Sequence, residues 1–446
     1  MIAFAFRHRI FAPLLAAIVL LTLTGCGAAP TAHQGSAPVV NTASDADMAL
    51  YNRVLGRVRA SYVEPVDDSK LIAYSLKGML TSLDPHSDFL TESEYQELLD
   101  EAEGEFAGIG AEISREDSLP KVISPIDNTP AARAGLKPGD IILKIDGKLT
   151  DGMSLKEVVD RLRGPVGSAV NITIGRVGER AFNVTLTRAV IHVASVTSHL
   201  EPDKIGYIRL SLFAERTNQD LVRALGDLTK KAGGRLNGVV LDLRNDPGGL
   251  LDQAVLVAGD FLDGGVVVST RGRDPDDNHV FNASAEGDRA RGVPVVVLIN
   301  GASASASEIV AGALKERHRA EILGTRSFGK GSVQTIIPMD GKGAVRLTTA
   351  LYYTPSGHSI QGEGIVPDVL VLPPKEQRGT QLDVVHEADL SGAIRNPGKL
   401  GATDTGPEAN IDPMLIGTPK DYQLKVALDR LMAEAGHNRT AAAGGR

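Results

Sequence analysis

The sequence predicts an α/β protein in which a helical segment precedes a compact, mostly β module and a larger α/β core. Apolar residues recur at three- and four-residue steps between 45 and 105, as in amphipathic helices. Short β-type runs alternate with turn signals between 106 and 190, and near-continuous apolar strands alternate with helices between 191 and 375. Such strands are typical of a sheet with helices on both faces, so the last region is expected to form the core.

The composition is that of a globular protein. The chain has 446 residues, of which 42% are hydrophobic and 23% charged, enough for two or three domains with a core each. Lysine and arginine total 47 against 55 aspartates and glutamates, a net charge of −8, and no dense basic stretch occurs outside the extreme N-terminus. This balance argues against nucleic acid as the main partner.

The first 25 residues resemble an export signal. A basic start at residues 7–9 precedes the apolar run Ile10–Leu23, which at 14 residues is too short to span a bilayer comfortably. Leu23-Thr24-Gly25-Cys26 resembles the lipobox of bacterial lipoproteins, which implies cleavage before Cys26 and lipidation of the only thiol in the chain. An uncleaved N-terminal anchor is the alternative. Either reading predicts a membrane-anchored envelope protein on the periplasmic side, and Gly27 favours the outer over the inner membrane.

The next two regions are a tether and a helical segment. Residues 26–44 are mostly Ala, Pro, Thr, Ser and Gln and are expected to be a flexible tether. In the helical segment, 45–105, a turn is expected at residues 83–87. Helical spacing is clearest at Leu50, Val54, Val58, Ile72, Leu76 and Leu80.

Specific elements are expected in the three remaining regions. In the β module, 106–190, turn signals bracket a strand at Ile141–Ile145, and one helix carries an apolar face from Leu155 to Leu162. The C-terminal extension, 376–446, is expected to be rich in loops and to end in a helix. The strands and helices expected after residue 190 are Ile205–Leu210, Val239–Leu243, Val266–Ser269, Val293–Ile299, Asn218–Lys231, Ala304–Arg317 and Tyr422–Ala435.

A serine stands where the strand ending at Ile299 turns into a helix. The segment Ser303-Ala304-Ser305-Ala306-Ser307-Glu308 consists largely of small residues, which let a substrate backbone approach closely. Beside the unpaired amides of a helix N-terminus, the hydroxyl of Ser305 suits nucleophilic acyl transfer. A plain helix cap is the alternative, because Ser305-x-x-Glu308 is also a capping box.

A lysine framed by two glycines follows, in Phe328-Gly329-Lys330-Gly331-Ser332-Val333-Gln334. In an apolar pocket, desolvation would lower the pKa of Lys330, and its neutral amine could take a proton from Ser305 without a histidine. The alternative is a solvated lysine in a glycine turn.

Together the two segments, with Ser305 and Lys330 25 positions apart, resemble the carboxy-terminal processing (tail-specific) peptidase family. The resemblance covers roughly residues 50–368. It implies a serine protease core at 191–375 with a crotonase- or Clp-protease-like fold. In the family pattern Ser305 is the nucleophile, Lys330 the base, and Gln334 the residue that orients the lysine.

The resemblance also assigns an oxyanion hole. The strand at 239–243 runs into Asp246-Pro247-Gly248-Gly249, a turn that in the family supplies one backbone amide. The residue after the nucleophile, Ala306, supplies the other. The sequence does not distinguish Gly248 from Gly249, and a tight β-to-α turn without a catalytic role is the alternative.

The module at 106–190 resembles a PDZ domain inserted before the protease core. Gly108-Ile109-Gly110 resembles the carboxylate-binding loop, in which backbone amides hold a peptide C-terminus that adds as a β-strand. The run from Ala134 to Ile142 is strongly PDZ-like. By the same resemblance, Arg163 couples the PDZ domain to the protease.

Two further residue types are assigned no catalytic role. Glu316 stands where many family members have Asp and is interpreted as a solvated helix charge. His86, His318 and His358 are interpreted as turn or surface residues, because the ten histidines are scattered and no His-Glu-x-x-His motif occurs. No metal or other cofactor is implied, which argues against a metallohydrolase.

The sequence therefore predicts an endopeptidase that cleaves near the C-termini of exported or envelope proteins, with a PDZ domain that selects or gates on unstructured, apolar tails. It leaves an adaptor protein and homo-oligomerisation open as further partners. The alternative is a catalytically inactive PDZ adapter that presents clients to another envelope enzyme.

Overall fold

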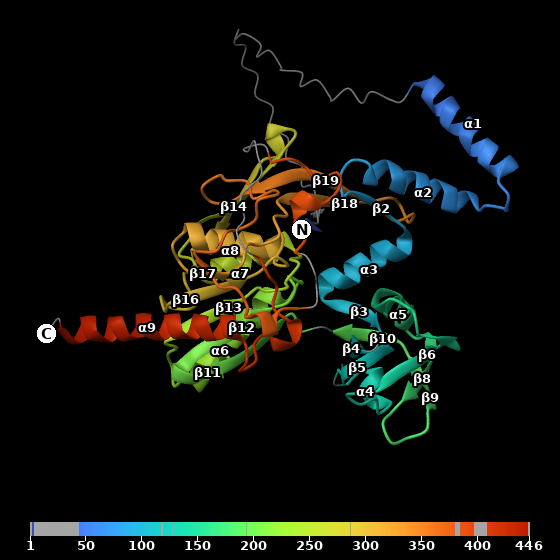
Figure 1. Ribbon diagram of the computed structural model, residues 1–446. Coiled ribbons are helices and arrows are strands. Elements are labelled where there is room, and N and C mark those ends of the chain that lie inside the picture. Colours follow the sequence, from blue (N-terminus) through green and yellow to red (C-terminus); the bar gives the residue numbers. More distant parts are fainter. Residues whose placement is uncertain are drawn as a thin grey trace, which may run out of the picture. The chain divides into compact units, whose positions relative to one another are not determined.

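The computed structural model describes residues 2–3, 44–116, 119–126, 128–192, 194–285, 287–379, 384–396 and 408–444 (Figure 1). Apart from Ile2–Ala3, the predicted signal lies outside the described residues, as do Cys26 and the predicted tether up to residue 43. The chain divides into two compact units, one of Phe4–Gly78 and one of Met1–Ala3 with Met79–Arg446.

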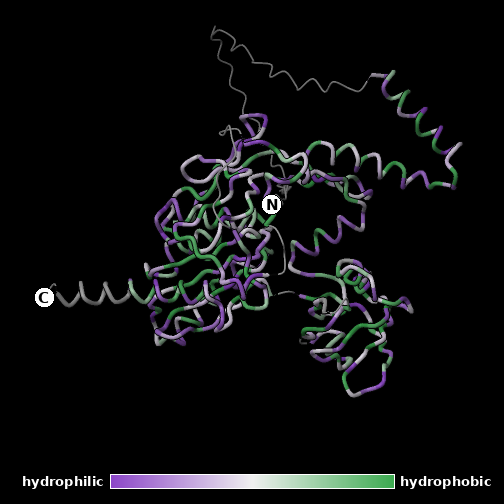
Figure 2. The backbone as a smooth tube through the Cα atoms, viewed as in Figure 1, coloured by the Kyte–Doolittle hydropathy of each residue, from purple (hydrophilic) through white to green (hydrophobic). Residues whose placement is uncertain are grey.

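The smaller unit contains α1 (Asp45–Ser61) and most of α2 (Asp68–Thr81). The side chain of Ser44 caps α1 by accepting a hydrogen bond from the amide of Asp47 at 3.2 Å. Hydrophobic and hydrophilic residues alternate along α1 (Figure 2), yet none of its residues is buried. The helices predicted from residue spacing are confirmed, although α1 contributes nothing to a core.

In the larger unit, α3 (Glu92–Glu103) leads into the β module. β3 (Glu105–Gly108) pairs with β10 (Ala189–His192), so the chain enters and leaves the module side by side. Between them lies an antiparallel sheet of order β4-β5-β6-β8-β9, with β7 beside β6. Its elements are β4 (Ala111–Glu116), β5 (Leu119–Pro125), α4 (Pro130–Arg133), β6 (Ile141–Ile145), β7 (Lys148–Leu149), α5 (Leu155–Leu162), β8 (Ala169–Gly175) and β9 (Phe182–Thr187).

The predicted strand and helix of this module are confirmed as β6 and α5. The interior includes Val122, Ile142, Val170 and Ile174, none of which has exposed surface. Helix α4 was not predicted from the sequence, because four residues are too few to show helical periodicity.

The core is a six-stranded sheet of order β11-β12-β13-β16-β17-β20, in which every pairing is parallel except that of β11 with β12. Alternate residues of β13 face opposite sides. Val239 and Leu241 pack with α6, α7 and α8, whereas Val240 packs with α9. The strands are β11 (Val196–Glu201), β12 (Ile205–Leu210), β13 (Gly238–Asp242), β16 (Val295–Ile299), β17 (Glu321–Gly324) and β20 (Val369–Leu370). The helices are α6 (Thr217–Lys231), α7 (Leu251–Gly259), α8 (Ala306–Glu316) and α9 (Tyr422–Gly444).

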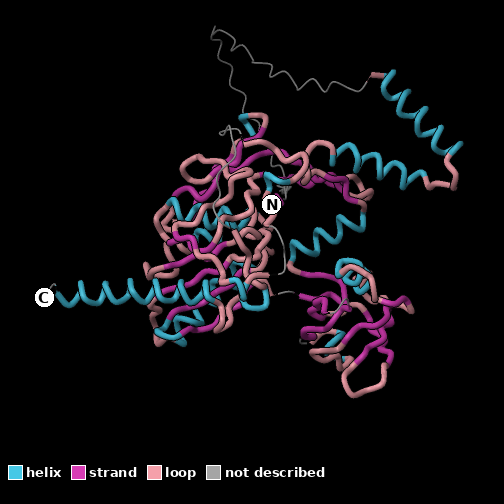
Figure 3. The backbone as a smooth tube through the Cα atoms, in the orientation of Figure 1, coloured by secondary structure: helices cyan, strands magenta, loops and turns pink. Residues whose placement is uncertain are grey.

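A second sheet of order β1-β18-β19-β14-β15 completes the core, with β2 beside β19. Figure 3 draws the strands of the structure in magenta and its helices in cyan. Of these strands the sequence predicted only β14, because β19 carries half-buried and polar residues instead of an apolar run. The strands are β1 (Ile2–Ala3), β2 (Asp88–Leu90), β14 (Gly265–Gly272), β15 (His279–Ala283), β18 (Ser332–Pro338) and β19 (Ala344–Tyr353).

The predicted α/β class, with helices on both faces of a largely parallel sheet, is confirmed. Among the described residues, no helix is both long and apolar enough to cross a bilayer.

Candidate active site

Ser305 occupies a strained turn between β16 and α8. Its φ of 58° and ψ of −112° place a non-glycine residue in a region that L-residues rarely adopt, at a cost of about 1–3 kcal/mol. The residue is fully buried, and its Oγ has no hydrogen-bond partner among the described residues. Only half of the predicted capping box forms: Glu308 accepts a hydrogen bond from the amide of Ser305 at 2.8 Å, while the serine hydroxyl stays unused.

The glycines beside Lys330 allow its loop to pack directly on the backbone of residues 360–364. The amide of Gly362 donates to the carbonyl of Gly329 at 2.8 Å. A Cβ added to Gly331 would lie only 2.7 Å from the amide nitrogen of Gln361. A side chain at this position would therefore force apart the two segments that place the lysine.

Lys330 donates from Nζ to Oε1 of Gln334, on β18, at 2.6 Å. The Gln334 Nε2 donates in turn to Ser332 Oγ and Thr348 Oγ1, both at 3.1 Å, so the amide oxygen must face the lysine. Loss of surrounding water lowers the pKa of Lys330 below its ordinary value, while the nearby carboxylate of Glu387 acts in the opposite direction.

The carboxylate of Glu308 joins the serine turn to the lysine loop. Besides the amide of Ser305, it accepts from Ser327 Oγ at 2.5 Å and from the amides of Gly329 and Lys330 at 2.7 and 2.9 Å. Burial raises the pKa of Glu308 to about 7, although these donors favour its ionised form. Tyr352, also buried, contacts the carbonyl oxygens of both Ser305 and Lys330.

The glycine turn after β13 lies against the serine turn. A Cβ on Gly248 would come within 2.8 Å of both the amide nitrogen of Ala306 and the Cβ of Ser305. The amide of Gly248 donates to Oδ1 of Asp246 at 2.8 Å, whereas the structure shows no acceptor for the amide of Gly249 among the described residues. Of the two predicted glycines, Gly249 thus has the free amide.

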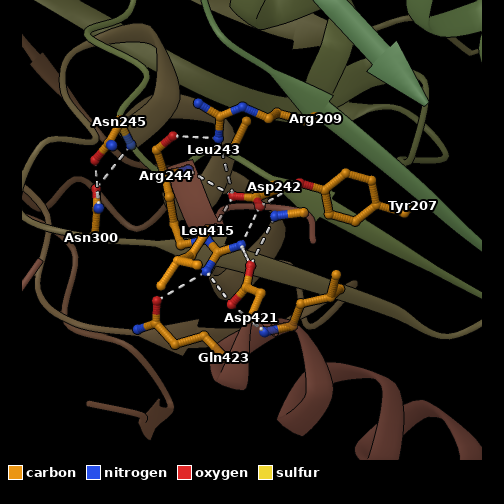
Figure 4. A network of polar contacts seen from close by, with 12 residues as sticks. Tyr207, Arg209, Asp242, Leu243, Arg244, Asn245, Asn300, Leu415, Asp421 and Gln423 are labelled. Carbon is orange, nitrogen blue, oxygen red and sulfur yellow. Dashed lines mark hydrogen bonds and ion pairs between the residues drawn. The ribbon is translucent and has the colours of Figure 1, made fainter. Parts of the chain in front are cut away.

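A buried ionic network holds the end of β13 (Figure 4). Arg244 has no exposed surface and donates from Nε to Asp242 Oδ1 at 2.9 Å and from Nη2 to Asp421 Oδ2 at 2.6 Å. Its Nη1 also donates to Gln423 Oε1 at 3.0 Å. Because Asp421 directly precedes α9 and Gln423 lies in its first turn, the C-terminal extension braces the strand that leads into the glycine turn.

Two asparagines link the glycine turn to the serine turn. The amide of Asn245 donates to Asn300 Oδ1 at 3.0 Å, and Asn300 Nδ2 donates to Asn245 Oδ1 at 2.7 Å. The structure thus places the serine turn, the loop of Lys330 with Gln334, and the glycine turn beside one another. The catalytic roles that the sequence assigned to these residues stay predictions.

Comparison with known proteins agrees with this arrangement. The model of Peptidase family S41 matches residues 204–371, and a PDZ domain model matches residues 121–176. A carboxy-terminal-processing protease of Bartonella bacilliformis is 48% identical over 394 residues, which cover 87% of this chain and 89% of that protein. The chain belongs to the carboxy-terminal processing proteases. It is a peptidase with a PDZ domain, and the predicted fold class is confirmed.

Two further relatives are less similar to this chain. The carboxy-terminal processing protease CtpA of Bacillus subtilis is 34% identical over 357 residues, covering 79% of this chain and 76% of that protein. The solved photosystem II D1 C-terminal processing protease is 31% identical, covers 77% of this chain and 97% of its own, and has a TM-score of 0.45.

The PDZ domain presents an unpaired strand edge beside the predicted carboxylate loop. β4 directly follows Gly110 and lies at the end of its sheet. Gly110 has a φ of 76°, and a Cβ there would lie 2.3 Å from the Cβ of Thr129, so only glycine fits. Among the described residues, no backbone hydrogen bond is donated by the amides of Ile109 and Gly110. The family's peptide-binding mode needs such amides and such an edge.

Arg163 ends α5, and its guanidinium lies 5.3 Å from the ring centroid of Phe106 on β3. This contact joins the PDZ helix to the strand through which the chain enters the module. The predicted coupling of Arg163 to the peptidase core stays a prediction.

One interpretation from the sequence was wrong. Glu316 is not a solvated helix charge, because it accepts from Thr354 Oγ1 at 2.6 Å and from the amide of Ser356 at 2.8 Å. His86 lies in a turn, as predicted, but its side chain is largely buried and its Nε2 lies 2.8 Å from Glu387 Oε2. The partners of Glu316 and of His86 are distant from them in sequence, so residue spacing does not predict these contacts.

The glycine turn contains a buried carboxyl, that of Asp246. Burial raises the pKa of Asp246 to about 8. Its Oδ2 has no partner among the described residues, as expected for a carboxyl that keeps its proton.

The unfolded chain releases the Asp246 proton at about pH 4, whereas the folded protein keeps it up to about pH 8, so this residue should make the free energy of unfolding fall as pH rises between these values. The variant Asp246→Asn should lose that decline and gain stability relative to wild type as pH rises. Urea denaturation across this range measures the difference. Parallel pH profiles for the two proteins would show that Asp246 is ionised in the folded state.

Proposed function

We propose that this protease uses Ser305 as its nucleophile and Lys330 as its general base. The observation that carries the proposal is the buried Oγ of Ser305, which has no hydrogen-bond partner in the described part of the chain. It lies in a turn that Glu308 ties to the loop of a lysine with a lowered pKa. A neutral Lys330 takes the proton from Oγ as it attacks the substrate carbonyl carbon. The lysine then gives this proton to the leaving amine, and water hydrolyses the acyl-enzyme.

The oxyanion that forms during attack is stabilised by two backbone amides. We assign them to Ala306, the first residue of α8, and to Gly249, because the amide of Gly248 already donates to Asp246. The positive end of the α8 dipole adds to this stabilisation.

Gln334 orients the lysine. In this structure Lys330 Nζ donates to Gln334, and proton transfer requires Nζ to come within about 3 Å of Oγ. Because the Gln334 amide is fixed by Ser332 and Thr348, it offers Lys330 one stable position from which the amine turns to the serine.

The PDZ domain binds the free C-terminus of the substrate in this proposal. The carboxylate meets the amides of Gly108, Ile109 and Gly110, and the peptide extends along β4. Arg163 would relay occupancy to the peptidase core. Substrates are unstructured, apolar tails of exported or envelope proteins, and lipidation of Cys26 would hold the enzyme on the periplasmic side of a bacterial membrane. The proposal also leaves room for an adaptor protein and for a homo-oligomer as further partners.

Loss of either dyad residue should abolish cleavage. Ser305→Ala and Lys330→Ala are expected to lower kcat/KM for an unfolded protein substrate by several orders of magnitude, because each removes a reacting group. Mass spectrometry of the products measures this loss, and a chelator should change nothing. The exposed residues Ser198 and Lys342 provide matched alanine controls. Cleavage by either dyad variant at the control rate would contradict the mechanism, and a wild-type protein that binds substrate without cutting it would indicate an adapter.

Blocking the substrate C-terminus should slow cleavage. A substrate whose terminal carboxylate is amidated should have a kcat/KM at most about one tenth of that of the free-acid substrate. The reason is that it loses the hydrogen bonds that the carboxylate loop donates to a charged group. Competition by a free apolar peptide is the accompanying measurement. Equal cleavage rates for the free and amidated substrates would contradict substrate selection by the PDZ domain.

A further inference from the structure

The C-terminal extension reaches the lysine loop at a second place, separate from the Arg244 network. The short helix η4 (Glu387–Asp389) lies beyond residue 371, where the match to the peptidase family ends. The amide of Glu387 donates to the carbonyl of Phe328 at 3.1 Å, and His386 Nδ1 lies 3.1 Å from the carbonyl of Ser327. A segment outside the matched region therefore holds the start of the lysine loop.

The side chain of Glu387 also connects to the end of that loop. Its carboxylate is completely buried and accepts from Gln361 Nε2 at 2.9 Å. Gln361 Oε1 accepts in turn from the amide of Gly331 at 2.8 Å. Since a carboxylate accepts hydrogen bonds and does not donate them, it sets the Gln361 amide with its oxygen toward Gly331.

His86 completes the group from the other side. Its Nε2 lies 3.0 and 2.8 Å from the two carboxylate oxygens of Glu387. The carbonyl of His86 accepts from Arg346 Nε at 3.0 Å, so this histidine is itself held by β19. A chain of polar contacts thus connects His86 through Glu387 and Gln361 to Gly331, the residue next to Lys330.

We propose that Glu387, with His86 and Gln361, is a positioning residue that fixes the Lys330 loop and supplies negative charge near the lysine amine. The proposal rests on the assignment of Lys330 as the general base. Glu387 does not touch the reacting atoms, and it acts on them through Gln361 and through its charge.

The charge of Glu387 shifts the pKa of Lys330 in a defined direction. The carboxylates of Glu387 and Glu308 raise the pKa of Lys330, whereas Arg346 and, above all, burial lower it. Removing the charge of Glu387 therefore lowers this pKa further. Since the base must be neutral to act, the acidic limb of the pH–rate profile should move to lower pH.

The test compares Glu387→Gln with Glu387→Asp in the full-length protein. Glu387→Gln should lower kcat by about tenfold to a hundredfold, because the lysine loop is misplaced, and should leave KM nearly unchanged. The acidic limb of its pH–rate profile should lie at lower pH than that of wild type. Glu387→Asp keeps the charge but is too short to bridge Gln361 and His86, so it should keep the acidic limb of wild type while still losing kcat.

Glu376→Gln is the matched control, because Glu376 is exposed on the same C-terminal extension. If Glu387→Gln matches Glu376→Gln in kcat and in pH profile, the proposal is overturned. Loss of the native fold in both Glu387 variants would make the residue purely structural and would overturn it equally. Ser305→Ala, assayed alongside, separates the two hypotheses: activity in that variant contradicts the proposed function itself.

Discussion

One buried carboxylate, that of Glu308, holds the two halves of the active site in register. It accepts hydrogen bonds from the amide of the serine turn and from two amides and one hydroxyl of the lysine loop. A residue in the strained conformation of Ser305 persists only where its surroundings over-determine it. The Glu308 carboxylate meets that need at the same point where it fixes the backbone of Lys330.

The C-terminal extension supports this centre from two directions. At the start of α9, Asp421 pairs with the fully buried Arg244, and breaking such a pair by removing one partner typically costs about 3–5 kcal/mol. At η4, Glu387 reaches the lysine loop through Gln361. Both anchors lie beyond the matched family region, so the catalytic geometry depends on more of the chain than its sequence motifs cover.

Local sequence patterns predicted most of the fold and pointed to the central residues of the candidate site. Apolar runs predicted β12, β13 and β16, and the two short motifs around Ser305 and Lys330 converge in space as expected. Strands with mixed exposure, such as β19, left no such pattern. His86 and Glu387 meet across 301 positions, and Glu316 pairs with Thr354 and Ser356 across about 40. These partnerships arise from tertiary packing, which neither periodicity nor spacing records.

The central claim is that burial lowers the pKa of Lys330, so that its amine can act as a base. It is tested most directly by an NMR titration of Lys330 in protein with isotope-labelled lysine, using the Ser305→Ala variant to prevent self-cleavage. We expect a pKa below the ordinary lysine value of 10.5. A pKa at or above that value would contradict it, because the amine would then be protonated whenever the enzyme works.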